Sequence, residues 1–194
     1  MNISKITEMP SNRKKIETIA TSSNKVSKII KGLDNIIDKK LNAFWVCPLI
    51  DESEKLDLTA ATNRFEKLKK IFGNNVGIIH GKMDIEEKKE IIDKFKSKEI
   101  LILVSTTIIE VGIDVPDATV MIIEEANRFG LSQLHQLRGR VGRSDRKSTC
   151  VLIYKEKNLN EYSKKRINTI KNTNDGFKIA EEDLKLRGFG EILG

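Results

Sequence analysis

The 194-residue sequence has few cysteines, prolines and aromatic residues, and it has no long hydrophobic run. Its two cysteines, Cys47 and Cys150, stand in separate apolar stretches without metal-ligand spacing, which predicts buried free thiols and no metal site. No apolar stretch approaches the ~20 residues of a membrane helix, and residues 1–10 lack the apolar core of a signal peptide. We therefore expect a soluble, cytoplasmic protein without a membrane partner.

A nucleotide-binding loop of the form G-x-x-x-x-G-K-[ST] is also absent. The single Gly-Lys pair, Gly81-Lys82, leads into Met83, and Asp51-Glu52 lacks the strand placement that would let two acids hold Mg²⁺. We therefore expect that this chain cannot hydrolyse ATP on its own.

The charge is basic and unevenly spread. The net charge is +7, and residues 1–40 contribute +5 of it, from nine Lys or Arg and four acids. Such a balance favours polyanionic partners, although a charged surface also serves solubility. Apolar residues make up 39% of the chain, which is enough for one sizeable core.

Strand-like and helix-like segments alternate through the middle of the chain. Apolar runs predict buried strands at residues 43–50, 76–79, 100–104, 119–123 and 150–154. Apolar positions spaced by three or four predict helices at residues 58–73, 85–95 and about 133–139. This order predicts an α/β fold, in which a parallel sheet has helices on both faces.

The two flanks differ from this core. Residues 1–25 are poor in apolar residues and predict an extended or poorly ordered arm, followed by a helix near residues 26–41. Residues 158–172 and 175–188 predict two further helices, the second with Ile179 and either Leu184 or Leu186 facing inward. We therefore divide the chain into a basic arm and helix (1–40), a core (41–155) and a helical tail (156–194).

Polar residues gather where the predicted strands end, which is where open parallel sheets bind ligands. Ser105, Thr106 and Thr107 directly follow an apolar strand, and their hydroxyl groups suit either phosphate oxygens or an ordinary helix N-cap. Gly112 and Asp114 precede Pro116 in a predicted turn, where the aspartate is free to bind a ribose hydroxyl or a main-chain group.

The segment 136–143, QLRGRVGR, combines three arginines with two glycines. Each glycine inside a helix costs roughly 1 kcal/mol relative to alanine, so Gly139 and Gly142 indicate a close approach of backbone or ligand. Arg140 and Arg143 lie three residues apart, near one face of a helix. Both could reach a γ-phosphate as arginine fingers.

Residues 105–116 and 136–143 together resemble motifs V and VI of superfamily 2 helicases, in the expected order and spacing. The segment NRFGLSQLHQLRGRVGR from Asn127 is similar both to the RecG family and to the transcription-repair coupling translocases. The segments VCPLIDESEKLDL, HGKM, EMPSNRKKIET and DGFKIAEEDLKLRGFGEILG favour RecG. The resemblance thus covers nearly the whole chain.

This resemblance implies a second RecA-like motor domain of an ATP-dependent helicase that acts on branched double-stranded DNA in repair and recombination. Arg140 and Arg143 would be the arginine fingers that complete an ATP–Mg²⁺ site on the first motor domain. Near the nucleotide would lie Gly112, Asp114 and Gln136. The DNA backbone would contact His80, Gly81, Lys82, Met83, Ser105, Thr106 and Thr107. His80 could instead simply satisfy a backbone group at the end of a strand.

The tail resembles the RecG hairpin that couples ATP turnover to translocation. Its candidate coupling residues are Arg166, Arg187, Gly188 and Gly190, the last two in an expected turn. Arg138 of motif VI is a further candidate. The tail could equally be a helical cap over a sheet edge. We expect further motor and wedge domains upstream in a monomeric parent protein and a tail truncated at Gly194. The alternative is a stand-alone, non-catalytic DNA-binding module.

Overall fold

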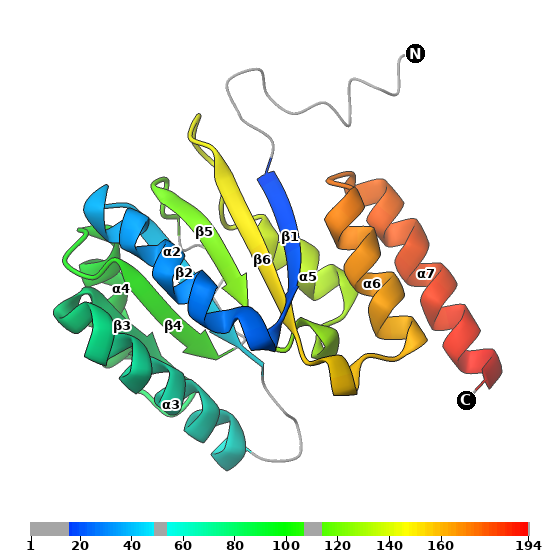
Figure 1. Ribbon diagram of the computed structural model, residues 1–194, viewed down its shortest axis with the longest axis horizontal. Helices are drawn as coiled ribbons and strands as arrows, with labels where there is room; N and C mark the ends of the chain where they lie inside the picture. The colour runs from blue at the N-terminus through cyan, green and yellow to red at the C-terminus, as the bar shows by residue number, and fades with distance from the viewer. Residues whose placement is uncertain (1–15, 49–53, 107–113, 194) are drawn as a thin grey trace.

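The computed structural model describes residues 16–48, 54–106 and 114–193. Within these ranges the chain forms one parallel sheet of six strands, in the order β1-β6-β5-β2-β4-β3, with helices packed around it (Figure 1). The strands are β1 (Ile16–Ser22), β2 (Asn42–Cys47), β3 (Val76–Ile79), β4 (Ile102–Thr106), β5 (Ala118–Ile123) and β6 (Ser148–Tyr154). The longer helices are α2 (Val26–Asp38), α3 (Glu54–Phe72), α4 (Ile85–Lys96), α5 (Leu131–Arg138), α6 (Glu161–Asn172) and α7 (Gly176–Leu193).

Strand β2 lies in the interior of the sheet, and all of its residues are buried. Its side chains alternate between two hydrophobic clusters. Phe44 and Val46 join one cluster, whereas Ala43, Trp45 and Cys47 join the other. Because both faces of a parallel strand are covered, a continuous apolar run replaces the alternating pattern of a half-exposed strand.

The helices divide between these two clusters. Leu33 of α2 and Leu68 of α3 pack into the cluster on one face, while Phe95 of α4, Leu134 of α5 and Ile167 of α6 pack into the cluster on the other. In Figure 1, α6 and α7 lie together beside the β1 end of the sheet. This arrangement confirms the predicted parallel sheet with helices on both faces.

Strand β1 corrects the expectation that residues 1–25 form an extended or poorly ordered arm, of which residues 1–15 lie outside the described residues. Residues 16–22 pair along their whole length with β6, from Ile16 opposite Ser148 to Ser22 opposite Tyr154. The segment carries little apolar surface of its own, and its hydrogen-bond partners lie about 130 residues away in the chain. A local pattern therefore could not predict the pairing. The linker role of residues 1–40 stays a prediction.

Most other elements lie close to their predicted positions, with three differences. Strand β4 continues to Thr106, so Ser105 and Thr106 are buried strand residues and do not follow the strand. Helix α5 ends at Arg138, before the arginine pair. Helix α7 runs through Gly188 and Gly190 without the expected turn, because good helix formers around the two glycines offset a cost of roughly 1 kcal/mol each.

On α7, Ile179 and Leu186 face inward, and Leu184 is exposed.

Both cysteines are free and buried, as predicted. Burial raises the pKa of the Cys150 thiol to about 12 and raises the pKa of Cys47 further. A thiol that stays protonated is a poor nucleophile, so neither cysteine is a reactive site. Among the described residues, no helix is long and apolar enough to cross a membrane.

Candidate nucleotide and DNA interface

Two residues predicted to lie near a nucleotide meet in the structure. The Arg143 guanidinium pairs with the Asp114 carboxylate across 3.8 Å, and its Nε donates to the Gly139 carbonyl across 3.2 Å. Both side chains remain largely exposed. Gln136 is exposed on α5, one turn before this loop, and Arg140 is half-buried. The structure therefore brings one guanidinium group and one carboxylate together in a loose ion pair, and Arg140 lies three residues before Arg143 in the same loop.

The arginine pair lies on a loop that follows α5, which corrects the expectation of a shared helical face. Gly139 caps the helix, and Gly142 has φ +76°, a left-handed conformation that ends the helical path. Gly142 also approaches Ile16 of β1 so closely that a side chain would not fit. The close approach predicted from the glycines is thus correct at Gly142, where the neighbour is the Ile16 side chain of β1.

The residues predicted to contact DNA gather at the carboxyl ends of two neighbouring strands. The parallel pairing of β3 with β4 sets Ile79 opposite Ser105, so His80 to Met83 follow beside the end of β4. The Lys82 N–H donates to His80 Nδ1 across 3.2 Å, and the Met83 N–H donates to the His80 carbonyl. Gly81 and Lys82 are exposed.

His80 therefore accepts a hydrogen bond from a backbone group at the end of a strand, which is the alternative to a DNA contact that the sequence predicted. Partial burial lowers the pKa of His80, which favours the neutral ring that accepts this hydrogen bond. The same hydrogen bond holds the turn in which Lys82 is exposed. His80 therefore has a structural role that keeps the charged Lys82 side chain at the surface.

Ser105 and Thr106 do not offer open hydroxyl groups. Both are buried, and Ser105 Oγ has no hydrogen-bond partner among the described residues. Thr107 and Gly112 lie outside the described residues. Among the members of the predicted DNA-binding set that the structure describes, the turn at residues 80–83 is the part exposed for contact.

Two of the predicted coupling arginines connect the core to the tail. Arg138 is 2% exposed and donates from Nη1 to the Ile170 carbonyl of α6 across 2.5 Å and to Thr18 Oγ1 of β1 across 3.3 Å. Arg166 of α6 donates to the Asn127 carbonyl across 2.9 Å. Burial lowers the pKa of both guanidinium groups. By contrast, Arg187 is exposed and pairs with Asp183 within α7.

A cluster at the carboxyl ends of β2 and β5 has no counterpart among the predicted site residues. Glu124 accepts a hydrogen bond from the Trp45 indole across 2.6 Å and another from Arg64 of α3, whose guanidinium lies over the Trp45 ring. These contacts anchor α3 to the sheet. Because the three residues lie far apart in the chain, no local motif could have indicated the cluster.

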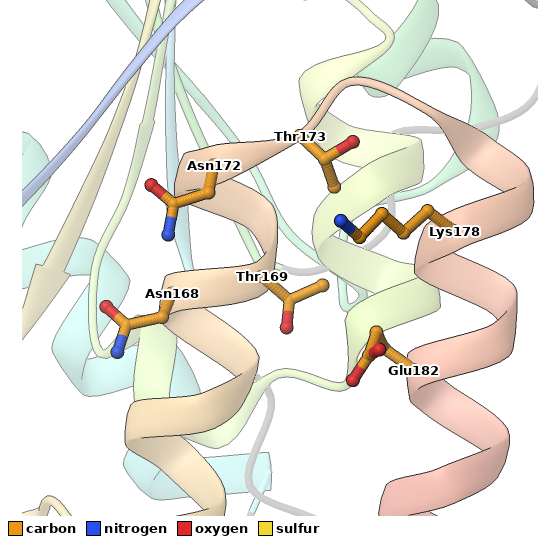
Figure 2. A pocket seen from close by; sticks show the side chains of 6 residues that line it. All are labelled: Asn168, Thr169, Asn172, Thr173, Lys178 and Glu182. Carbon is orange, nitrogen blue, oxygen red and sulfur yellow. The ribbon is translucent and has the colours of Figure 1, made fainter.

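A small cavity lies between α6 and α7 (Figure 2). Its volume is about 200 Å³, below the roughly 300 Å³ at which ligand pockets begin. Its lining comprises Asn168, Thr169, Asn172, Thr173, Lys178 and Glu182. None of the predicted site residues lines this cavity, so we assign no nucleotide to it.

Comparison with known families shows which kind of protein carries the turn at residues 80–83 and the loop with Arg140 and Arg143. The model of the helicase conserved C-terminal domain matches residues 24–145, which contain the turn at His80 and both Arg140 and Arg143 of the loop at residues 139–147, the arginine loop. The chain belongs to this helicase family.

Relatives of this helicase domain cover its full length. It is 51% identical to the ATP-dependent DNA helicase RecG of Aquifex aeolicus and 44% identical to that of Bacillus subtilis. In both comparisons all of this chain is matched, but it spans only 25% and 28% of the relatives. The identity supports the predicted resemblance to RecG.

Solved structures agree with the family. RecG bound to a three-way DNA junction matches 95% of this chain and 24% of its own, with a TM-score of 0.79 and 41% identity. The C-terminal domain of the DEAD-box protein Dbp5 matches 88% of this helicase domain and 97% of its own chain, with a TM-score of 0.59 and 18% identity. The second likeness concerns the fold alone, and together they confirm a RecA-like domain.

Proposed function

We propose that this chain is the second motor domain of a RecG-type, ATP-dependent DNA helicase that acts on branched DNA such as stalled forks and Holliday junctions. The observation that carries the proposal is the arginine loop beside Asp114 in a chain that is 51% identical to a RecG helicase. A role in cytoplasmic DNA repair and recombination belongs to the same proposal. So does a monomeric parent protein that also contains the first motor domain and a wedge domain.

The residues present fit one side of an ATP–Mg²⁺ site. Arg143 is 44% exposed and is held by a long ion pair with Asp114 and one hydrogen bond to the Gly139 carbonyl, so its guanidinium is available to an incoming phosphate. ATP would supply the phosphoryl group that is transferred to water, and Mg²⁺ would be held mainly by the first motor domain. In this arrangement Arg140 and Arg143 stabilise the negative charge that develops on the γ-phosphate. Asp114, once Arg143 leaves it, accepts a hydrogen bond from a ribose hydroxyl.

Contact with DNA falls to the turn at residues 80–83. Exposed Lys82 offers a charge to a backbone phosphate, while the hydrogen bond to His80 fixes the turn. Helix α5 joins the two functions, because it carries Gln136 at its surface and leads directly into the arginine loop. Its last residue, Arg138, is bonded to α6, so a shift of α5 would reach the tail.

The two alternatives are less well supported. The first is a stand-alone DNA-binding module, and the second is the matching domain of a transcription-repair coupling translocase. Motif VI of this chain is compatible with both. The relatives named above, however, are RecG helicases along the entire chain, including the tail. We therefore favour the RecG-type motor.

A chimera tests the proposal. In the Aquifex aeolicus RecG, the matching segment is replaced by this chain, and ATP hydrolysis is measured with a three-way DNA junction. We expect DNA-stimulated activity that Arg143→Ala lowers by a factor of about 10³, because one phosphate contact is lost in the transition state. Lys147→Ala removes a charge from the same loop at a 74% exposed position and should have little effect. Equal activity of Arg143→Ala and the parent chimera would refute the arginine-finger assignment.

A further inference from the structure

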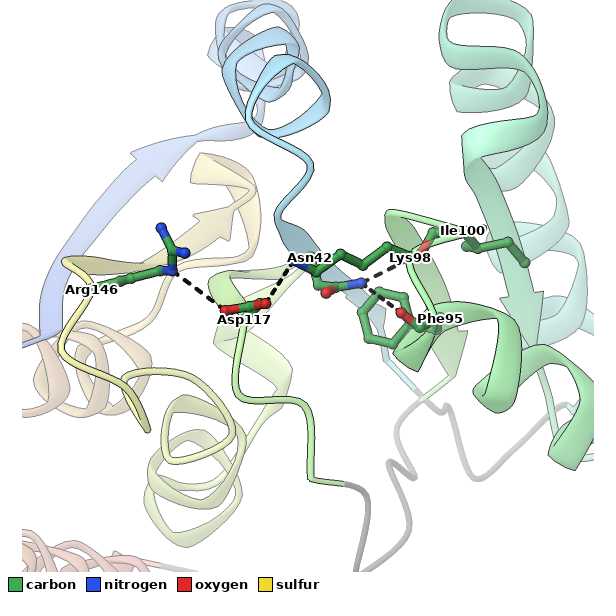
Figure 3. A network of polar contacts seen from close by, with 6 residues as sticks. All are labelled: Asn42, Phe95, Lys98, Ile100, Asp117 and Arg146. Carbon is green, nitrogen blue, oxygen red and sulfur yellow. Dashed lines mark hydrogen bonds and ion pairs between the residues drawn. The ribbon is translucent and has the colours of Figure 1, made fainter.

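The amino ends of β2, β5 and β6 meet the turn after α4 in one polar junction (Figure 3). Its buried member is Asn42, which is 1% exposed. Asn42 Nδ2 donates to the Phe95 carbonyl across 2.8 Å and to the Ile100 carbonyl across 3.4 Å. The Asn42 N–H donates to the Asp117 carbonyl across 3.1 Å. Asn42 thus fixes the backbone at Asp117 relative to the end of α4.

The Asp117 side chain bridges two cations from opposite sides of the junction. Lys98 Nζ lies 2.7 Å from one carboxylate oxygen, and Arg146 Nε lies 3.4 Å from the other. The hydrogen bond from Lys98 contributes most to lowering the pKa of Asp117, and Arg146 adds to it. The carboxylate is therefore charged whenever the protein is folded near neutral pH.

Lys98 is an unusual residue for its position. Its φ of +69° is left-handed, and the residue that follows a helix in this conformation is most often glycine. A lysine here gives the turn a side chain that reaches Asp117. The turn is thereby fixed to the same carboxylate as Arg146.

Residues 114–117 and residues 143–146 are joined by two ion pairs. Asp114 pairs with Arg143, and three residues further along both segments Asp117 pairs with Arg146. The two pairs differ in strength. Asp114 is 64% exposed and its contact is long, whereas Asp117 is 32% exposed and its carboxylate is shared with Lys98.

We infer that Asp117 is a positioning residue for the arginine loop, because it fastens the loop at Arg146 to the sheet and leaves Arg143 free to exchange Asp114 for another anion. The inference rests on the proposed function for the identity of that anion, a nucleotide phosphate. With Gly142 packed on Ile16 and Arg146 held by Asp117, the backbone on either side of Arg143 is fixed before a ligand arrives. Binding then orders one side chain and not the whole loop.

Hydrogen exchange on the full 194-residue chain tests this inference. Asp117→Asn and Arg146→Gln should each speed amide exchange at residues 139–147 by roughly two- to fivefold, the range expected from loss of a surface ion pair. Exchange in β2 and β5 should not change. Lys147→Gln is the matched control, since it removes the neighbouring charge, whose partner is Glu17 and not Asp117. Arg146→Lys should restore slow exchange in part.

The inference is overturned if Arg146→Gln alters exchange at residues 139–147 no more than Lys147→Gln does. It is also overturned if exchange rises equally throughout the chain, since that result means general destabilisation. Arg146 is 52% exposed, so its replacement leaves the core intact even if Asp117→Asn folds poorly. The measurement uses neither ATP nor DNA, so it stands apart from the chimera test of the proposed function.

Discussion

At the scale of single residues, Gly142 shows how the arginine loop depends on one backbone angle. Its φ is +76°, and an added Cβ would lie 2.6 Å from Ile16 Cγ1. Both the left-handed conformation and the contact with β1 exclude a side chain. The glycine is therefore explained by the fold, without a ligand that approaches it.

We expect Gly142→Ala to lower the free energy of unfolding by about 2–4 kcal/mol, from backbone strain together with overpacking. Gly32→Ala is the control: Gly32 lies in α2 with open space around its Cα, so alanine should stabilise the chain by about 0.5–1 kcal/mol. Urea unfolding of both variants measures the difference. Similar stability of the two variants would contradict the role assigned to Gly142.

Asp117 should make stability depend on pH in the acid range. Because the folded state lowers the pKa of Asp117, this group adds stability above its unfolded pKa of about 3.9, and that stability is lost as the pH falls through the lower folded value. The stability gap between the natural chain and Asp117→Asn should therefore be largest near pH 6 and shrink towards pH 3. Urea unfolding across this range checks the trend, and a gap that widens in acid would contradict it.

At the scale of elements, α7 illustrates how packing chooses between residues that look alike in sequence. Ile179 is 2% exposed against the core, whereas Leu184 of the same helix is 71% exposed. The sequence restricted the second inward position to Leu184 or Leu186, and the structure selects Leu186. The angle at which α7 meets α5 and α6 decides this choice, and a single helix does not contain that information.

Truncation of these two residues should have unequal effects. Ile179→Ala should cost about 2–4 kcal/mol of stability, from lost burial and the cavity left behind. Leu184→Ala should change stability by no more than about 0.5 kcal/mol. Denaturant midpoints and slopes for the two variants provide the measurement. Equal losses would show that α7 packs through a different face.

At the scale of the whole molecule, the net charge of +7 favours weak binding to DNA through phosphate contacts. If the isolated chain contacts as few as about two phosphates, its affinity should fall about tenfold between roughly 50 and 200 mM salt. Fluorescence anisotropy with a labelled three-way junction measures this dependence. Lys82→Gln should reduce the steepness, because it removes one phosphate contact. Affinity that does not change with salt would count against an electrostatic interface.

The sequence alone determined the α/β class, the order of most elements and the family resemblance. These depend on local patterns: apolar runs of strand length, helical spacing, and the motif QLRGRVGR with its preceding hydroxyl segment. It also identified three candidate cations, the exposed Lys82 and Arg143 and the half-buried Arg140, because residue type and spacing carry that information. Their roles in binding remain predictions.

Only the tertiary structure decided what surrounds these residues. It paired β1 with β6, buried Ser105 and Arg138, and brought Asp117 to Lys98 and Arg146. Each of these contacts joins segments that are distant in the chain. Their formation depends on the closure of long loops around a shared core, and no short stretch of sequence encodes that geometry.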